Sequence, residues 1–443
     1  MNSRRPIIAL ICIGAIIVAV LTFVPYSLTM VKQAGHKVAN AVQTSLGREP
    51  QPAFEAEMQK PIVPQFDVAL WYGARGEEPE RQGVLIQTFD GSRVFASHNA
   101  DTTFNPASLV KLTTTLVALK RLGPDYRFVT HVFTDGTIDA KGTLDGNLYL
   151  ESNDPTFGDA SANVIAKELR ARGITRVKGK ILAAPGFSFN FNERAEDSAG
   201  FAARVMQLKE SATGMEEAKG TELFALYSNP MREILLYMNA HSNNFVADRI
   251  GAFLGGPQAI VRTLVEELKL PPEQVALETA SGLYNNRMTP RGVLVVIKAL
   301  VEEAQRQGLK PEDLLPVVGC DWGTVRRRME GTGYECSLVG KTGTLTTTDG
   351  GMSNLAGVVF TKDSGLILFA ILAQGNRIWE HKQMADQLLA ETINGHPPAP
   401  LMDAETHRQL LPPNSLRVEQ RSEVRGQRLV KATSDPKSQS GGR

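Results

Sequence analysis

The sequence is poor in cysteine and histidine, and it has no excess of charge of either sign. Among its 443 residues are 3 cysteines and 7 histidines, with no Cys-x-x-Cys pair and no close Cys/His cluster. A structural zinc site is therefore not expected, and the sequence suggests no other metal or cofactor. Its 48 basic and 47 acidic side chains leave a net charge of +1, which gives no basis for a nucleic-acid partner.

Long hydrophobic runs are also rare, and the one exception lies near the start of the chain. Hydrophobic residues make up 42% and charged residues 21%, which excludes collagen-like, wholly disordered and multi-spanning membrane proteins. Residues 7–24 carry no charge and follow Arg4 and Arg5. As a helix this run would span about 27 Å, so we expect an uncleaved inner-membrane anchor and a periplasmic or otherwise extracytoplasmic body. The alternative is a signal peptide cleaved near residues 39–41.

Two of the three cysteines lie outside this run. Cys320 and Cys336 could form a disulfide in an oxidising compartment, closing a loop of about 17 residues and contributing ~3 kcal/mol. Two buried thiols are an equally good interpretation of the same positions. The sequence leaves both open.

Changes in composition divide the chain into several parts, and its length allows about three domains. Most of the chain is expected to form one α/β domain with an insertion. The expected parts are a basic segment with a membrane helix or signal at 1–30, a tether at 31–64, the main domain at 65–124 and 226–396, an inserted strand-rich lobe at 125–225, and a polar, largely disordered tail at 397–443.

Local patterns predict the elements of the main domain. The expected helices lie at 108–120, 230–240, 245–254, 258–268, 289–307 and 377–393. The expected strands lie at 83–89, 93–97, 338–343, 354–361 and 366–372, with turns at 90–91 and 362–365. In the lobe, strands are expected at 126–133, 147–150 and 177–182 and a helix at 162–172, whereas 185–225 shows no clear period, 210–222 reads as a loop and 413–443 as disordered.

A serine and a lysine three residues apart begin the first predicted helix of the main domain. Ser108 and Lys111 would lie one turn apart on one helix face, where the lysine could act as a base for the serine hydroxyl. A neutral lysine requires a lowered pKa, which desolvation and a second cation can provide. Alone this motif is weak, because the same pattern occurs at Ser434 and Lys437 in the tail.

Two further motifs follow in the chain. Ser-x-Asn occurs four times, and the copy at Ser242 and Asn244 is singled out because it lies between two predicted helices. Lys341-Thr342-Gly343 occurs once, on a predicted strand. In this order, the three motifs define the site of penicillin-recognising serine enzymes.

The surrounding sequence narrows the family. The segments that carry the resemblance lie at 105–114, 147–156, 228–239, 281–283, 341–345 and 355–357. They resemble the D-alanyl-D-alanine carboxypeptidase/endopeptidase family of type-4 low-molecular-mass penicillin-binding proteins. The resemblance implies a penicillin-recognising serine enzyme fold, similar to β-lactamases and transpeptidases, with an inserted lobe. It also implies hydrolysis of the terminal D-Ala-D-Ala bond of peptidoglycan stem peptides and often of D-alanyl cross-links, with β-lactams as covalent inhibitors.

By the same resemblance, Ser108 is the nucleophile that forms the acyl-enzyme, and Lys111 is its general base. Ser242 would pass a proton to the leaving amine. Asn244 would bind the substrate amide and hold Lys111 in place.

The third motif would bind the other end of the scissile bond. Lys341 and Thr342 would bind the terminal carboxylate, and Lys341 would be the second cation near Lys111. The backbone N–H groups of Ser108 and Thr344 would form the oxyanion hole. Gly343 would let the substrate backbone approach the strand.

The inserted lobe contributes one candidate, and the chain departs from the family in places. Asp154 would recognise the free amine of a diamino acid in the stem peptide; an ordinary turn Asp before Pro155 is the alternative. The spacing between Ser108 and Ser242 is shorter than in the largest family members. After residues 281–283, where the family commonly has Ser-Arg, this chain has Tyr-Asn and places an arginine later.

Two other functions fit the same motifs. A class A β-lactamase needs a Glu that activates the deacylating water, and no Glu-x-x-Leu-Asn stands between the second and third motifs. The other is a catalytically weak, anchored penicillin-binding or wall-binding receptor that uses the same cleft. Turnover of D-Ala-D-Ala separates the receptor from the peptidase.

Overall fold

The computed structural model describes residues 65–192, 194–208, 211–401 and 411–419. Contacts divide the chain into two units, Met1–Pro64 and Gln65–Arg443, and the account below concerns the second. The expected anchor at 7–24 and tether at 31–64 therefore lie outside the described residues. Within the four described ranges, no helix has both the length and the apolar character needed to cross a bilayer.

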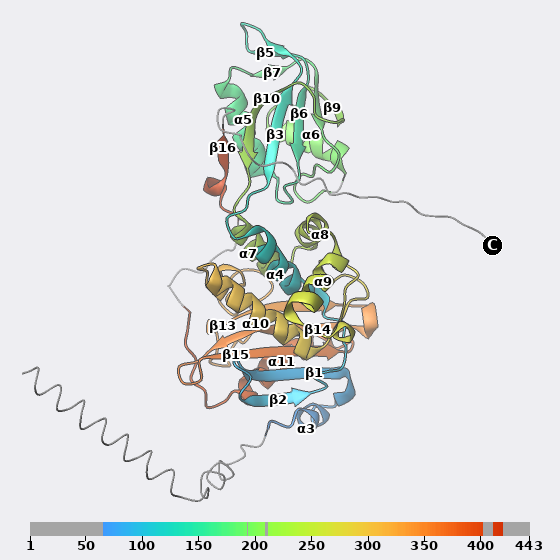
Figure 1. Ribbon diagram of the computed structural model, residues 1–443, viewed down its shortest axis with the longest axis vertical. Helices are drawn as coiled ribbons and strands as arrows, with labels where there is room; N and C mark the ends of the chain where they lie inside the picture. Colours follow the sequence, from blue (N-terminus) through green and yellow to red (C-terminus); the bar gives the residue numbers. More distant parts are fainter. Residues whose placement is uncertain (1–64, 193, 209–210, 402–410, 420–443) are drawn as a thin grey trace, which may run out of the picture. The chain divides into compact units, whose positions relative to one another are not determined.

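The main domain is built on a five-stranded antiparallel sheet in the order β13-β14-β15-β1-β2 (Figure 1). Its strands are β1 (Gln82–Thr88), β2 (Val94–His98), β13 (Leu338–Leu345), β14 (Met352–Phe360) and β15 (Leu366–Gln374). The predicted turn at 362–365 joins β14 to β15, whose pairing begins at Phe360 and Leu366. Both central strands are buried along nearly all their length, as expected for a sheet covered on both faces.

Helices cover the two faces of this sheet (Figure 1). On one face pack α3 (Val68–Gly73) and α11 (Ile378–Thr392), and on the other α4 (Val110–Leu122) and α10 (Pro290–Arg306). Neighbouring strand residues alternate between the two cores, so Leu355 packs toward α11 and Ala356 toward α10. Thr289 begins α10 by accepting a hydrogen bond from Gly292 N, the predicted cap before a first-turn proline.

The remaining helices of the main domain form the region that carries the second motif. They are α7 (Met231–His241), α8 (Asn244–Phe253) and α9 (Pro257–Leu268). Short elements complete the domain: β11 (Val275–Ala276), β12 (Arg287–Met288), and the 3₁₀ helices η1 (Pro79–Arg81), η2 (Ala107–Leu109), η3 (Pro272–Gln274), η4 (Pro311–Asp313) and η5 (Thr348–Gly350).

The lobe has its own sheets and its own core. A six-stranded sheet has the order β16-β10-β3-β6-β8-β9, and a three-stranded sheet the order β4-β5-β7. The elements are β3 (Val129–Thr134), β4 (Thr137–Ile138), β5 (Thr143–Asp145), β6 (Leu148–Ser152), α5 (Asp159–Ala171), β7 (Arg176–Val177), β8 (Lys180–Ala183), α6 (Ala195–Val205), β9 (Ala212–Met215), β10 (Thr221–Tyr227), η6 (Pro413–Ser415) and β16 (Arg417–Glu419).

The structure differs from the expectations about the lobe at three places. The aperiodic stretch 185–225 contains α6, and the expected loop at 210–222 contains β9 and the start of β10. The helix was missed because it buries small residues, Ala199, Ala202 and Ala203, rather than a stripe of large apolar ones.

The tail expected to be disordered from 413 instead forms η6 and β16, which pairs with β10. Residues 420–443 lie outside the described part of the chain.

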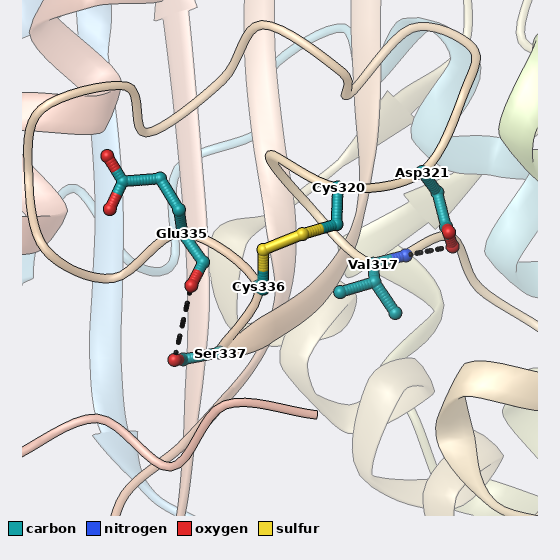
Figure 2. The surroundings of a disulfide bond; sticks show 6 residues. All are labelled: Val317, Cys320, Asp321, Glu335, Cys336 and Ser337. Carbon is teal, nitrogen blue, oxygen red and sulfur yellow. Dashed lines mark hydrogen bonds between the residues drawn. A yellow bond between two sulfur atoms is a disulfide. The ribbon is translucent and has the colours of Figure 1, made fainter. Parts of the chain in front are cut away.

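The two cysteines left open by the sequence form a disulfide. Cys320 and Cys336 are joined across a Cα–Cα distance of 5.4 Å (Figure 2). Beside them the Asp321 carboxylate accepts a hydrogen bond from Val317 N at 2.7 Å, and Ser337 Oγ bonds to the Glu335 carbonyl (Figure 2). The segment between the cysteines is thus closed into a loop immediately before β13.

Candidate active site

Ser108 lies in a tight turn just before α4. It belongs to η2, after Ala107 with φ of +48°, so the regular helix begins two residues later than predicted. Asn105 supports this turn, because its Oδ1 accepts a hydrogen bond from Ala107 N at 3.0 Å. Gly282 packs against the Ala107 carbonyl so closely that a Cβ could not fit there. The turn holds Ser108 half-buried at the N-terminal end of α4.

The Lys111 side chain is completely buried and contacts three oxygen atoms. Its Nζ lies 3.0 Å from Ser108 Oγ, 2.7 Å from Asn244 Oδ1 and 2.6 Å from the carbonyl oxygen of Ser281. The amide and carbonyl oxygens can only accept, so they hold two N–H groups of the amine. In a neutral amine the remaining lone pair is then directed at the hydroxyl of Ser108, which is the geometry of a base and its nucleophile.

Burial also favours the neutral form of the Lys111 amine. Desolvation lowers the pKa of Lys111 to about 7, and the negative charge of Asp248 opposes this shift. The repulsion expected between the two lysines is seen at Lys341. Lys341 is itself completely buried, and its pKa is lowered well below the ordinary value, first by burial and then by the charge on Lys111. A positive charge on one of these two buried amines therefore disfavours a positive charge on the other.

The second motif stands at the junction of two helices, as predicted. Ser242 ends α7 in the left-handed conformation, with φ of +52°. Asn243 is the N-cap of α8 and accepts a hydrogen bond from Val246 N at 3.0 Å. Asn244 is the first residue of α8, which directs its side chain to Lys111. Lys341 Nζ donates to Ser242 Oγ at 2.9 Å, which brings the second and third motifs together.

The third motif lies on β13, at the edge of the five-stranded sheet. Along the outer edge, the carbonyl of Leu338 accepts from Val318 N and the amide of Gly340 donates to Pro316 O. Along an antiparallel strand, the N–H and C=O groups of every second residue point to the same side. Those of Thr342 and Thr344 therefore point to the outer edge, as those of Leu338 and Gly340 do. The backbone N–H of Thr344 is therefore turned away from β14, as an oxyanion-hole donor requires.

Gly343 lies in close contact with a neighbouring turn. A Cβ at this position would lie 2.6 Å from the carbonyl oxygen of Pro106 and 3.2 Å from Ala107 Cβ. The glycine thus allows β13 to pack against the turn that carries Ser108. Asn354 on β14 reinforces this contact by donating its side-chain amide to Asn105 O at 3.0 Å.

Asp154 stands apart from the three motifs. It lies in the lobe, in the loop after β6, and it is buried. Its Oδ1 accepts hydrogen bonds from Thr156 N at 2.8 Å and Thr156 Oγ1 at 2.6 Å. Desolvation raises the pKa of Asp154 to about 6, although the two hydrogen bonds from Thr156 lower it.

Several residues around the motifs were not predicted. Ser281 was noted only as part of the resemblance, and a carbonyl oxygen carries no side-chain signal. Asp349 binds Arg287 in an ion pair at 3.0 Å and accepts from Asn105 Nδ2 at 2.9 Å, which ties the loop after Ser281 to the nucleophile turn. Thr324, whose Oγ1 accepts from Thr342 Oγ1 at 2.8 Å, gave no signal in the sequence. Within the described ranges, no group of three His, Cys, Asp or Glu side chains could hold a metal ion.

Comparison with known sequences points to one enzyme class. The model of the D-Ala-D-Ala carboxypeptidase 3 (S13) family matches residues 74–189 and 206–392. Carboxypeptidase DacB of Mycolicibacterium smegmatis is 28% identical over 331 residues, which cover 60% of this chain and 71% of that protein. The D-alanyl-D-alanine carboxypeptidase of an Actinomadura species is 28% identical over 112 residues, which cover 24% of this chain and only 21% of that protein.

Solved structures share the fold. The predatory endopeptidase Bd0816 of Bdellovibrio bacteriovorus superposes with a TM-score of 0.63 at 23% identity, covering 75% of this chain and 98% of that one. Penicillin-binding protein 4 of Haemophilus influenzae superposes with a TM-score of 0.56 at 16% identity, covering 69% of this chain and 96% of that one.

Proposed function

Because the chain belongs to the D-Ala-D-Ala carboxypeptidase 3 (S13) family, we propose that it is a serine peptidase that hydrolyses the terminal D-Ala-D-Ala bond of peptidoglycan stem peptides. One observation carries the proposal: the buried Lys111 amine, with its pKa lowered to about 7, lies 3.0 Å from Ser108 Oγ. A serine hydroxyl needs such a base, and a lysine of ordinary pKa would be protonated at neutral pH.

In the acylation step, Ser108 Oγ attacks the carbonyl carbon of the penultimate D-Ala while its proton moves to Lys111 Nζ. The backbone N–H groups of Ser108 and Thr344 stabilise the oxyanion. As the C–N bond breaks, the departing D-Ala amine takes up a proton through Ser242 Oγ, and Lys111 returns to the neutral form. Asn244 holds Lys111 with its Oδ1 and binds the substrate amide with its side-chain Nδ2 group.

In the deacylation step, a water molecule attacks the ester carbonyl formed on Ser108. Its proton passes to Lys111 and from there to Ser108 Oγ as the C–O bond to the enzyme breaks. The same groups therefore serve both half-reactions, and no cofactor is required. A β-lactam would acylate Ser108 in the same way, as the solved structure of penicillin G-acylated Bd3459 illustrates for that protein.

The substrate's terminal carboxylate would bind at Lys341 and Thr342. Both side chains are buried, and the ammonium of Lys341 is next to Ser242. Burial and Lys111 lower the pKa of Lys341, and an anionic carboxylate offsets this by favouring the charged ammonium. Asp154 in the lobe would meet the free amine of a diamino acid farther along the stem peptide. Cleavage of D-alanyl cross-links is the second candidate activity, which the endopeptidase titles of the structural neighbours suggest.

We place this activity outside the cytoplasm, where peptidoglycan stem peptides are found. The Cys320–Cys336 disulfide supports this location, since disulfides persist in oxidising compartments. Attachment to the inner membrane through residues 7–24 remains part of the proposal, on the ground of their uncharged sequence.

The first test is covalent labelling of the full-length protein with a fluorescent penicillin, followed by intact mass measurement. Wild type should gain one adduct, and Ser108→Ala should gain none. Ser434→Ala is the matched control, because it removes the serine of the other Ser-x-x-Lys pattern and should label as wild type does.

Unlabelled enzyme from the same preparation is then assayed for release of D-Ala from a D-Ala-D-Ala peptide. Labelling with D-Ala release supports the peptidase. Labelling without release favours the penicillin-binding receptor, and rapid loss of the adduct by hydrolysis of the penicillin favours the β-lactamase. A folded wild type that neither labels nor releases D-Ala would contradict the catalytic role of Ser108.

A further inference from the structure

The loop closed by the disulfide reaches into the site. We infer that Thr324, in this loop of residues 318–337, is a positioning residue that orients the Thr342 hydroxyl toward the substrate's terminal carboxylate. This deepens the proposed function and rests on it. Through Thr324, the disulfide loop favours peptides that end in a free carboxylate.

The tip of the disulfide loop contacts two of the three motifs. Thr324 Oγ1 lies 2.8 Å from Thr342 Oγ1, on the strand of the third motif. The backbone N–H of Thr324 donates to the Ala240 carbonyl at 2.9 Å, two residues before Ser242. Gly323, with φ of +112°, packs against Ala240 with no room for a Cβ. One short segment thus fixes the position of Thr342 relative to the end of α7.

The base of the disulfide loop is fixed on β13. Val318 N donates to the Leu338 carbonyl at 2.8 Å, and Cys336 N donates to the Val318 carbonyl at 2.9 Å. The disulfide between Cys320 and Cys336 joins the two ends covalently next to these bonds (Figure 2). Because Thr324 follows Cys320 by four residues, this closure limits the freedom of the backbone that carries it.

The outer part of the disulfide loop is attached to α11. Arg328 and Asp386 form a buried ion pair with Nη2–Oδ1 at 2.7 Å, and Met329 N donates to the same carboxylate at 3.0 Å. The hydroxyl of Tyr334 donates to Ile393 O at 2.8 Å. With its base, outer part and tip all bonded, the loop has the rigidity that a positioning role requires.

Hydrogen-bond chemistry explains what Thr324 does. A carboxylate accepts hydrogen bonds but donates none, so Thr342 must turn its single proton toward it. In the free enzyme that proton can be given to Thr324 Oγ1. When substrate binds, Thr324 donates its own proton to Thr342 instead, and the two hydroxyls form a chain that ends on the carboxylate. Without Thr324, the Thr342 hydroxyl has no partner to hold it in this orientation.

The test compares a D-Ala-D-Ala peptide that ends in a free carboxylate with the same peptide ending in a carboxamide. We expect Thr324→Val to lower kcat/KM for the free acid about tenfold, mainly through KM, because a hydrogen bond that supports a charged acceptor is lost. The carboxamide should be hydrolysed at nearly the wild-type rate. Thr324→Ser keeps the hydroxyl and should restore the preference for the free acid.

A control in the same loop separates positioning from folding. Thr332→Val removes a hydroxyl that bonds to Met329 O at 2.6 Å, away from the three motifs, and should leave the selectivity unchanged.

The outcomes divide cleanly. A Thr324→Val variant that slows both peptides equally, or neither, overturns the inference while the proposed function stands. Wild type that cleaves the D-Ala-D-Ala bond of neither peptide contradicts the proposed function, and the inference fails with it.

Discussion

At the scale of single residues, the protonation of Lys111 controls the first step of the proposed reaction. With a pKa of about 7, the amine is mostly protonated below neutral pH and cannot accept the proton of Ser108. The second-order rate of acylation by penicillin should therefore rise about tenfold per pH unit up to about pH 7 and level off above it. Stopped-flow labelling between pH 5.5 and 8.5 measures this profile.

The matching variant is Lys111→Arg, which keeps a cation in the site but cannot act as a base. Acylation should fall by about 10²–10⁴-fold at every pH, the usual contribution of a general base. A wild-type rate that does not change with pH over this range would exclude Lys111 as the base.

Asp154 gives a second prediction, which concerns stability. Its pKa is about 6 in the folded protein and 3.8 for an ordinary Asp, so the folded state holds this proton more tightly. Stability is therefore lost as pH rises from about 4 to about 6, and above that the buried charge costs up to about 3 kcal/mol. Asp154→Asn should raise the free energy of unfolding at pH 7.5 but not at pH 4. In the proposed function Asp154 also binds a substrate amine, so the variant should have a higher KM for peptides whose diamino acid carries a free amine.

Urea unfolding at the two pH values tests the stability effect. Asp139→Asn is the control, because Asp139 is an exposed carboxyl of the same lobe that accepts hydrogen bonds from Lys141 N and Thr143 N, which lower its pKa. Asp139→Asn should lower the free energy of unfolding at neutral pH. An equal effect of Asp154→Asn on stability at both pH values would contradict the prediction that a charged Asp154 destabilises the folded protein.

The residues that the sequence identified share one property. In the proposed function, Ser108, Lys111, Ser242 and Lys341 act through side chains that belong to short motifs, which a linear pattern can show. Ser281 acts through a backbone carbonyl, and Thr324 through a contact with a strand that follows it by a whole loop. Such roles depend on tertiary contacts and leave no local pattern.

At the scale of elements, the contact between β13 and the nucleophile turn determines the shape of the site. Gly343→Ala would place a Cβ 2.6 Å from Pro106 O, and neither backbone can move without separating the two elements. We expect a stability loss of about 1–3 kcal/mol. Acylation should fall about 10²-fold, because an ångström of misplacement has that effect on reacting groups. Thermal melts and penicillin labelling measure the two effects.

Gly73→Ala at the end of α3 is the control for this substitution, since a Cβ there would have no heavy atom within 4 Å. It should leave both the melting temperature and the labelling rate close to wild type. Wild-type labelling by Gly343→Ala would show that the close packing of β13 is not needed for acylation.

The elements that could be predicted are those whose periodicity comes from large apolar residues. Helices such as α10, and the strands β14 and β15, were predicted to within about two residues at most ends. The lobe was harder, because β9 is four residues long and largely exposed, and α6 buries alanines. A strand of this kind is stabilised by its neighbours in the sheet and not by its own composition.

At the scale of the whole molecule, the end of the described chain returns to the lobe. β16 pairs with β10 from Tyr227 to Ala225, and the Tyr227 hydroxyl donates to Glu419 Oε2 at 2.8 Å. Before the strand, Ser415 Oγ donates to Glu233 on α7 at 3.0 Å. This pairing joins residues almost 200 positions apart, so nothing in the local sequence at 413–419 could indicate it.

The role of this segment can be isolated by comparing a chain that ends at residue 419 with one that ends at residue 410. Without 411–419, β10 becomes an edge strand, and the Arg127 side chain loses its bond to the Ser415 carbonyl. We expect the shorter chain to melt several degrees lower, since each lost kcal/mol lowers the melting temperature by about 2–4 °C in a domain of 150–250 residues. Hydrogen exchange should accelerate in β10 and β3, while β14 and β15 in the main sheet keep their protection. Equal exchange in the two chains would mean that β16 contributes no stability to the lobe, whereas faster exchange in β14 and β15 as well would mean that the segment stabilises the main domain and the lobe as one cooperative unit.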